Sequence, residues 1–222
     1  MQLVLIRHGE SEANFQNYWT GWLDVPLTSK GRLQAQQAGE KIKSAKIEFD
    51  QAYTSVLQRS LITCQKVLES CDQLWIPTEK TWRLNERHYG ALVGKNKDEM
   101  KRQFGAEQVK RWRRGFYQLP PFVEQNHFDR RYAHLDPSLL PKGESLALTL
   151  ARVLPLWQDQ LAPALVEGKN LLVVGHGNSL RALVKYLEEI PDDDVDQIDI
   201  PNATPVLYEF TKDLQIKHKI LL

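Results

Sequence analysis

Strand-like and helix-like segments alternate along this chain, as the order of its apolar and polar positions indicates. Four short runs are typical of strands in a sheet covered on both faces, at residues 3–6, 51–54, 74–76 and 171–175. Two more strand-like runs follow near the end, at residues 206–210 and 215–220. Segments with a helical pattern cover about residues 28–44, 57–69, 97–115, 145–161 and 180–188. This alternation predicts an α/β fold, a three-layer α/β/α sandwich with a mostly parallel central sheet.

Three local signals refine the expected helices. Thr28 or Ser29 is a suitable cap for the first one. Pro155 lies inside the fourth, where it predicts a kink or a restart. Arg59 falls in the first turn of the second helix, where a cation is not favoured unless an anion binds beside it. The alternative for Arg59 is a solvated surface arginine.

Two of the expected strands, at residues 3–6 and 171–175, end just before a His-Gly pair. If these strands are parallel neighbours, His8 and His176 emerge at the same edge of the sheet, which is where open α/β sheets place their chemistry. An imidazole beside the guanidinium of Arg7, with small polar residues following, predicts a phosphate site that contains a nucleophilic histidine. The alternative is that both histidines are core residues with satisfied hydrogen bonds.

Length and composition limit what kind of protein this is. The chain has 222 residues, of which 42% are apolar, enough for one substantial core and not clearly for two. We therefore expect a single domain over residues 1–222, with a surface excursion or lid at about 119–143, where proline and histidine are frequent and periodicity is weak. No charged segment precedes the first strand and no apolar run approaches the roughly 20 residues of a membrane span, so we expect a cytoplasmic protein.

The charge pattern argues against nucleic acid and membrane as partners. The chain carries 29 lysines and arginines against 28 acidic residues, a net charge of +1. One basic run, at residues 110–114, includes a tryptophan and could in principle contact nucleic acid. No other basic segment extends it into a continuous face, so we expect neither a nucleic acid nor a membrane partner.

Several motifs together resemble the cofactor-dependent phosphoglycerate mutase branch of the histidine phosphatase superfamily. In chain order they are RHGES at 7–11, TGW at 20–22, YTS at 53–55, Arg59, LNERHYG at 84–90, WRRG at 112–115 and GHGNS at 175–179. The resemblance covers nearly the whole chain and weakens between residues 119 and 143. It implies interconversion of 3-phosphoglycerate and 2-phosphoglycerate in glycolysis and gluconeogenesis, through a phosphohistidine primed by 2,3-bisphosphoglycerate.

The catalytic residues that we expect are His8, Glu86, His176, Arg7 and Arg59. His8 would be the nucleophile, since the pKa of a histidine lies close to cellular pH. Arg7, Arg59 and His176 would surround the phosphoryl group, with His176 acting best when protonated. By its position in the NERHYG motif, Glu86 would exchange a proton with the substrate hydroxyl. The alternative for Glu86 is an ion pair with Arg83 or Arg87.

A substrate with two anionic groups needs two cationic clusters, and the sequence supplies both. The expected substrate-binding residues are Ser11, Asn14, Thr20, Gly21, Arg87, Tyr89, Lys97, Arg113, Arg114, Gly177 and Asn178. We expect no metal, because the histidines at 8, 88, 127, 134 and 176 share no ligand spacing. The expected partners are small phosphoglycerates, and the sequence leaves a homodimer open.

Two other functions remain compatible with the sequence. A phosphatase would use the same histidines and pass the phosphoryl group to water. The NERHYG and WRRG motifs favour the mutase, because a simple phosphatase need not hold a second anionic group. A non-catalytic phosphate-binding protein is the other alternative, and the presence of His8, His176 and Glu86 together argues against it.

Overall fold

The structure is a computed structural model that describes residues 1–124 and 129–222. Six strands form one sheet in the order β3-β2-β4-β1-β5-β6. Their bounds are β1 Gln2–Arg7, β2 Gln51–Thr54, β3 Thr78–Lys80, β4 Leu171–Gly175, β5 Val206–Phe210 and β6 Ile216–Leu221. The pairs β1–β4, β4–β2 and β2–β3 are parallel, and β5 and β6 add an antiparallel edge. The mostly parallel sheet predicted from the sequence is therefore confirmed.

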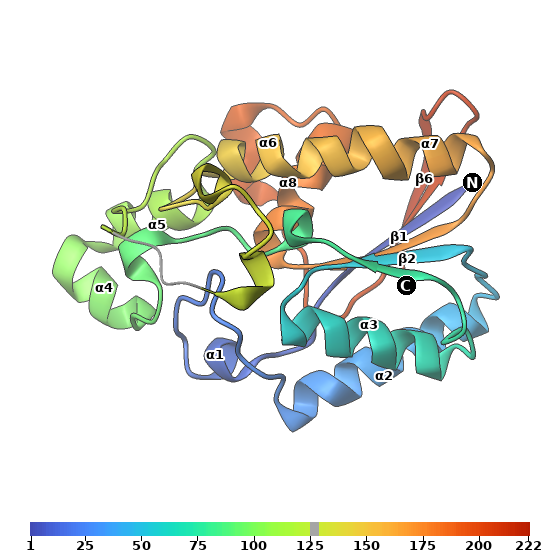
Figure 1. Cartoon of the computed structure of the whole chain (residues 1–222), viewed down its shortest axis with the longest axis horizontal. Coiled ribbons are helices and arrows are strands. Elements are labelled where there is room, and N and C mark those ends of the chain that lie inside the picture. The colour runs from blue at the N-terminus through green and yellow to red at the C-terminus, as the bar shows by residue number, and fades with distance from the viewer. Residues whose placement is uncertain (125–128) are drawn as a thin grey trace.

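Helices cover both faces of this sheet, as Figure 1 shows. The helices are α1 Glu12–Phe15, α2 Ser29–Ser44, α3 Gln58–Ser70, α4 Lys97–Phe104, α5 Ala106–Arg114, α6 Leu146–Leu156, α7 Ala162–Val166 and α8 Gly177–Leu187. On one face, α2 and α3 pack against the side chains of Val4, Ile6 and Val174. On the other, α6, α7 and α8 cover Leu5 and Val173. The predicted three-layer sandwich is thus confirmed, with α4 and α5 set apart beyond one end of the sheet.

Adjacent residues of one strand therefore face different layers. In β1, Leu3 and Leu5 belong to the core under α6 and α8, whereas Val4 and Ile6 belong to the core under α2 and α3. All four side chains are fully buried. A strand buried on both faces must be apolar at every position, and this is why the run at residues 3–6 lacks alternation.

Most of the helices expected from the sequence are confirmed, including α2 with Thr28 as its cap, where the Thr28 hydroxyl accepts from the Gly31 amide. The segment at 97–115 differs, because Gly105 adopts φ +85° and divides it into α4 and α5. A kink or a restart is expected at Pro155, and the restart is absent, because α6 continues through Pro155 to Leu156. A π-helical turn at Trp157–Leu161 then joins α6 to α7 directly.

The strand expected at residues 74–76 is wrong. That segment forms a turn in which Trp75 is 80% exposed, and the strand is the polar segment Thr78–Lys80 instead. β3 lies at the edge of the sheet and pairs only with β2, so its side chains need not be apolar. Backbone pairing, which the sequence pattern does not reveal, selects this strand.

The expected excursion at 119–143 lies partly outside the described residues, which omit 125–128. Its described parts include two short 3₁₀ turns, Arg130–Tyr132 and Pro137–Leu139. The hydroxyl of Tyr132 accepts from the Asn85 side chain at 2.8 Å, so the segment packs against the loop that carries Glu86. Its role as a lid stays a prediction, as does the single-domain organisation.

Candidate active site

The two predicted histidines lie side by side at the end of β1 and β4. The parallel register pairs Arg7 with Gly175, and the His8 amide donates to the Gly175 carbonyl at 3.0 Å. As a result the rings of His8 and His176 have centroids 4.9 Å apart. Gly9 then lets the chain pass α2 closely, because a Cβ there would lie 2.1 Å from the Gly31 carbonyl oxygen.

Hydrogen bonds orient both rings. His8 Nδ1 lies 2.7 Å from the carbonyl oxygen of Gly9, so Nδ1 carries the proton and donates it. This tautomer leaves a lone pair on His8 Nε2, which is the form that a nucleophilic histidine needs. His176 Nε2 lies 2.7 Å from the hydroxyl of Ser55, on the loop after β2. Ser55 is fully buried, so this contact is shielded from water.

Both imidazoles are held neutral. Burial, followed by the charges of Arg59 and Arg7, lowers the pKa of His8 far below its usual range. Burial and Arg59 lower the pKa of His176 in the same way. The expectation that His8 titrates close to cellular pH and that His176 is protonated is therefore not met by the protein alone. A neutral His8 is nonetheless the nucleophilic form over the whole physiological range.

Around these rings, three buried side-chain nitrogens lack a hydrogen-bond partner in the part of the chain that the structure describes. They are Arg7 Nε, Arg59 Nε and His176 Nδ1. Buried donors in native proteins are nearly always paired, so a group of unpaired donors fits an anion that they would share. The Nη atoms of Arg59 donate to the carbonyls of Leu23 and Gly21, which ties the loop after α1 to this point. The arginine expected in the first turn of α3 is there, with only 1% of its surface exposed.

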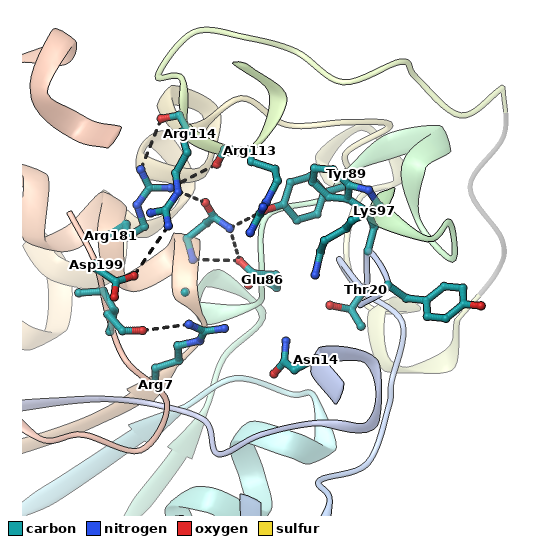
Figure 2. A pocket seen from close by; sticks show the side chains of 15 residues that line it. Arg7, Asn14, Thr20, Glu86, Tyr89, Lys97, Arg113, Arg114, Arg181 and Asp199 are labelled. Atoms are coloured by element: carbon teal, nitrogen blue, oxygen red, sulfur yellow. Dashed lines mark hydrogen bonds and ion pairs between the residues drawn. The ribbon is translucent and has the colours of Figure 1, made fainter. Parts of the chain in front are cut away.

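A pocket that shares Arg7 with this inner site carries a second group of cations (Figure 2). Lys97 enters it from α4, and Arg113 and Arg114 enter it from α5. Arg114 donates to the Ile198 carbonyl at 3.2 Å, and its Nη2 lies 3.9 Å from the carboxylate of Asp199. Of the two cationic clusters anticipated from the sequence, the second therefore lines the pocket, and the inner one reaches it through Arg7.

Glu86 lies between the two clusters. Its Oε1 accepts three N–H groups, from the Arg87 amide at 2.9 Å, the Asn178 amide at 3.0 Å and the Asn178 side chain at 3.1 Å. The side chains of Arg87 and Arg83 turn elsewhere and donate to the carbonyls of Glu144 and Arg152. The alternative of an ion pair with either arginine is therefore not supported by this geometry.

A buried ion pair braces the segment that carries Glu86. Arg152 on α6 binds the carboxylate of Glu144 through Nε at 2.7 Å, and both side chains are less than 10% exposed. The same guanidinium donates to the carbonyls of Arg83, Asn85 and Glu86. Glu144 also accepts from the His88 amide at 2.7 Å. Together these contacts fix the backbone on both sides of Glu86.

We expect Glu144→Gln to lower the free energy of unfolding by about 3 kcal/mol, because the amide leaves the buried charge of Arg152 uncompensated. Urea denaturation measures this loss. Glu69→Gln is the control, since its partner Lys66 is exposed and such a pair contributes less than about 1 kcal/mol. Equal losses in the two variants would show that the buried pair is not a structural brace.

Most of the predicted substrate-binding residues line the pocket, namely Asn14, Thr20, Tyr89, Lys97, Arg113, Arg114, Gly177 and Asn178. Three others do not line it. Ser11 caps α1, Gly21 adopts φ +50° beside Val93, and Arg87 is fully buried with its guanidinium directed at the carbonyls of Glu144 and Gln118. Among the predicted catalytic residues, Arg7 and Glu86 line the pocket, and His8, Arg59 and His176 lie in the inner site.

The sequence analysis missed five residues that line the pocket, Tyr18, Trp19, Arg181, Asp199 and Ile200. Arg181 alone had a detectable signal, because it follows Asn178 by three positions and so shares its face of α8. Asp199 and Ile200 come from a segment far along the chain with no motif of its own. The Ile200 carbonyl accepts from Arg7 Nη1 at 3.0 Å, and this segment precedes β5, which pairs with β1.

Neither a metal cluster nor a membrane helix is found where the structure describes the chain. Within residues 1–124 and 129–222, no three His, Cys, Asp or Glu side chains are grouped as metal ligands. His127, one of the histidines considered above, lies outside these residues. None of the helices described combines the length and apolarity that crossing a bilayer needs.

Two histidines lie at one edge of a mostly parallel sheet with the side chains of Arg7 and Arg59 around them, an arrangement that fits a histidine-based phosphoryl-transfer site. In agreement, the family model of the histidine phosphatase superfamily (branch 1) matches residues 3–219. The chain belongs to this superfamily and, within it, to the family of 2,3-bisphosphoglycerate-dependent phosphoglycerate mutases. The second assignment follows from curated relatives with that name in Streptococcus sanguinis and Streptococcus pneumoniae. Each is 54% identical over 221 residues, covering 97% of this chain and 96% of the relative.

Solved structures agree on the fold. A mycobacterial glucosyl-3-phosphoglycerate phosphatase in complex with VO3 superposes with a TM-score of 0.76 over 99% of this chain and 96% of that one, at 23% identity. YhfR of Bacillus stearothermophilus gives 0.74 at 26% identity, over 95% of this chain and 91% of that one. At these identities the likeness supports the architecture, whereas the family assignment rests on the curated relatives.

Proposed function

We propose that this protein interconverts 3-phosphoglycerate and 2-phosphoglycerate, with His8 carrying the phosphoryl group between the two positions. One observation carries the proposal: a neutral histidine lies among buried nitrogens without a hydrogen-bond partner, next to a pocket that shares Arg7 with this inner site and holds a second group of cations. A molecule with an anionic group at each end matches this layout. The 54% identical relatives named as mutases support the same reaction.

In the inner site, His8 Nε2 attacks phosphorus while the bond from phosphorus to the departing oxygen breaks. The hydrogen bond from Nδ1 to the Gly9 carbonyl stabilises the positive charge that develops on the ring. Arg7 and Arg59 donate to the equatorial phosphoryl oxygens through their Nε groups, which have no partner in the free protein. When the Ser55 hydroxyl donates to His176 Nε2, the neutral ring carries its proton on Nδ1, which has no partner in the free protein and donates to the phosphoryl group.

The residues present fit 2,3-bisphosphoglycerate as a cofactor. The unpaired donors of Arg7 and Arg59 would hold one phosphate, and Lys97, Arg113 and Arg114 would hold the other acidic groups. When bound, the cofactor supplies the phosphoryl group that primes His8. No metal takes part in this proposal.

Glu86 exchanges a proton with the substrate oxygen. Its three N–H donors all converge on Oε1, so Oε2 is the oxygen that can take and return a proton. Glu86 is only 8% exposed and shares the pocket with Arg7 and Tyr89, which keeps the proton from passing freely to bulk water. The brace formed by Arg152 keeps this carboxylate in place during both half-reactions.

A product assay with 3-phosphoglycerate, with and without added 2,3-bisphosphoglycerate, tests the proposed function. We expect 2-phosphoglycerate to form, and to form faster once the bisphosphate is added. Release of inorganic phosphate without 2-phosphoglycerate would instead assign a phosphatase. Binding without either product would assign a non-catalytic phosphate-binding protein.

Substrate affinity should fall as the pH rises above about 8. Burial, followed by the charges of Arg113 and Arg7, lowers the pKa of Lys97 to about 8, so the free protein loses this cation above that pH. The anionic substrate binds the charged form, so its KM should rise up to about tenfold per pH unit there. KM measured from pH 7 to 9.5 checks this, with Lys97→Met expected to show no such rise. The exposed Lys95→Met is the control and should follow the unaltered protein.

We also propose a cytoplasmic location, which the small-molecule substrate and the glycolytic role support. A homodimer stays a prediction about its assembly, which sedimentation velocity checks.

A further inference from the structure

Arg181 on α8 is buried beside the pocket, yet none of the motifs considered above includes it. Only 5% of its surface is exposed, and burial followed by the charge of Arg114 lowers its pKa to about 10. Nη1 donates to Asn178 Oδ1 at 3.0 Å, and Nη2 donates to the Val195 carbonyl at 2.5 Å. Longer contacts of 3.4 Å reach the carbonyls of Arg113 and Arg114 at the end of α5. Arg181 therefore connects α8 with two other segments of the pocket wall.

We propose that Arg181 is a positioning residue that fixes the side-chain amide of Asn178 against Glu86 and ties it to the helix that carries Arg113 and Arg114. Its effect on turnover rests on the role proposed for Glu86 above. The chain of contacts runs from α5 through Arg181 and Asn178 to Glu86. Figure 2 labels Arg181 and Glu86, the two ends of its side-chain part.

The chemistry of arginine determines which way the Asn178 amide points. A guanidinium has donors only, so the amide atom that faces Arg181 must be the oxygen. The amino group then faces the other way, where it donates to Glu86 Oε1 at 3.1 Å and to the Tyr89 hydroxyl at 2.7 Å. In the opposite orientation, an amide oxygen would lie against the carboxylate oxygen of Glu86. Arg181 excludes that orientation, because two acceptors would then face each other and its own Nη1 would lose its partner.

The contacts to α5 give Arg181 a second and separable effect. The last turn of α5 carries Arg113 and Arg114, whose carbonyls accept from Arg181 while their side chains enter the pocket. Loss of Arg181 should therefore weaken substrate binding through α5 and slow turnover through Asn178. The first effect appears in KM and the second in kcat, so kinetics can separate them.

A double-mutant cycle of Arg181→Met and Asn178→Ala tests the inference. We expect Arg181→Met to lower kcat about tenfold in the unaltered protein and to leave kcat unchanged in the Asn178→Ala background, because both act through the same amide. The rise in KM caused by Arg181→Met should persist in both backgrounds. If the losses of kcat caused by Arg181→Met and Asn178→Ala multiplied in the double variant, the inference would be overturned. An effect of Arg181→Met on KM alone would overturn it as well. Arg181→Lys, which keeps the charge but offers no fork, provides a second variant and should have an intermediate kcat.

Lys185→Met is the matched control. Lys185 lies four residues further along α8 and tethers the same segment, donating to the Ile190 carbonyl at 3.0 Å and pairing with Asp192 at 2.7 Å. It does not contact Asn178. If Arg181 and Lys185 had a purely structural role, Arg181→Met and Lys185→Met would lose kcat equally. We expect Lys185→Met to retain full kcat.

A second measurement does not depend on activity. The side-chain NH₂ signals of Asn178, assigned in ¹⁵N-labelled protein by their loss in Asn178→Ala, should be shifted and protected from solvent exchange. Arg181→Met should abolish this protection and Lys185→Met should keep it, whereas protection that survives Arg181→Met would overturn the inference. If the unaltered protein forms no 2-phosphoglycerate, the proposed function fails, and these signals still decide the position of the amide.

Discussion

Replacing His8 by alanine should lower mutase turnover by about 10⁴-fold or more and abolish uptake of a labelled phosphoryl group, as removal of a nucleophile does. The ring is neutral because burial and the charges of Arg59 and Arg7 lower its pKa, and the Gly9 carbonyl leaves its Nε2 as the attacking atom. In the part of the chain that the structure describes, no other side chain of the inner site offers a free lone pair at the position of His8 Nε2. The measurement is incubation with 2,3-bisphosphoglycerate labelled in its phosphate groups, followed by detection of an adduct that is labile in acid and stable in base.

His134→Ala is the control for this experiment, because His134 is an exposed histidine of the excursion at 129–143. It should take up label and turn over substrate like the unaltered protein. A His8→Ala protein that still became labelled and active would mean that another residue is phosphorylated, and the proposed mechanism would be wrong.

Glu86→Gln should lower turnover by about 10²-fold or more while binding of the bisphosphate persists. Glutamine keeps an oxygen that can accept the amides of Arg87 and Asn178, so the local structure should remain. What it loses is the oxygen that exchanges a proton with substrate. Steady-state kinetics, together with a direct binding measurement such as calorimetry, separates the two effects.

Glu10→Gln is the matched control for Glu86→Gln. The same change is made two residues after His8, but on a carboxylate that is held by Thr28 and Lys30 away from the pocket. It should leave turnover within about twofold. Normal turnover in Glu86→Gln would remove this residue from the mechanism and leave it as a structural acceptor of three N–H groups.

The sequence by itself determined the fold class and the position of the inner site. β1 and β4 are recognisable because a strand buried on both faces is apolar at every position. Since both strands end in a His-Gly pair, their parallel pairing was enough to bring His8 and His176 together. A local pattern predicts such a feature well when the same few residues form the element and carry the chemistry.

Only the tertiary structure decided the features that depend on partners distant in the sequence. β3 could not be placed from its polar residues, because pairing with β2 at the edge of the sheet selects it. The direction of the Arg87 side chain is set by carbonyls 31 and 57 residues away, so its motif gave no indication that it turns from the pocket. The sequence suggested a His8 pKa near cellular pH and a protonated His176, but burial, with the charge of Arg59, lowers the pKa of both and keeps them neutral. Hydrogen-bond partners and burial arise from chain folding, and neither leaves a periodic trace in the sequence.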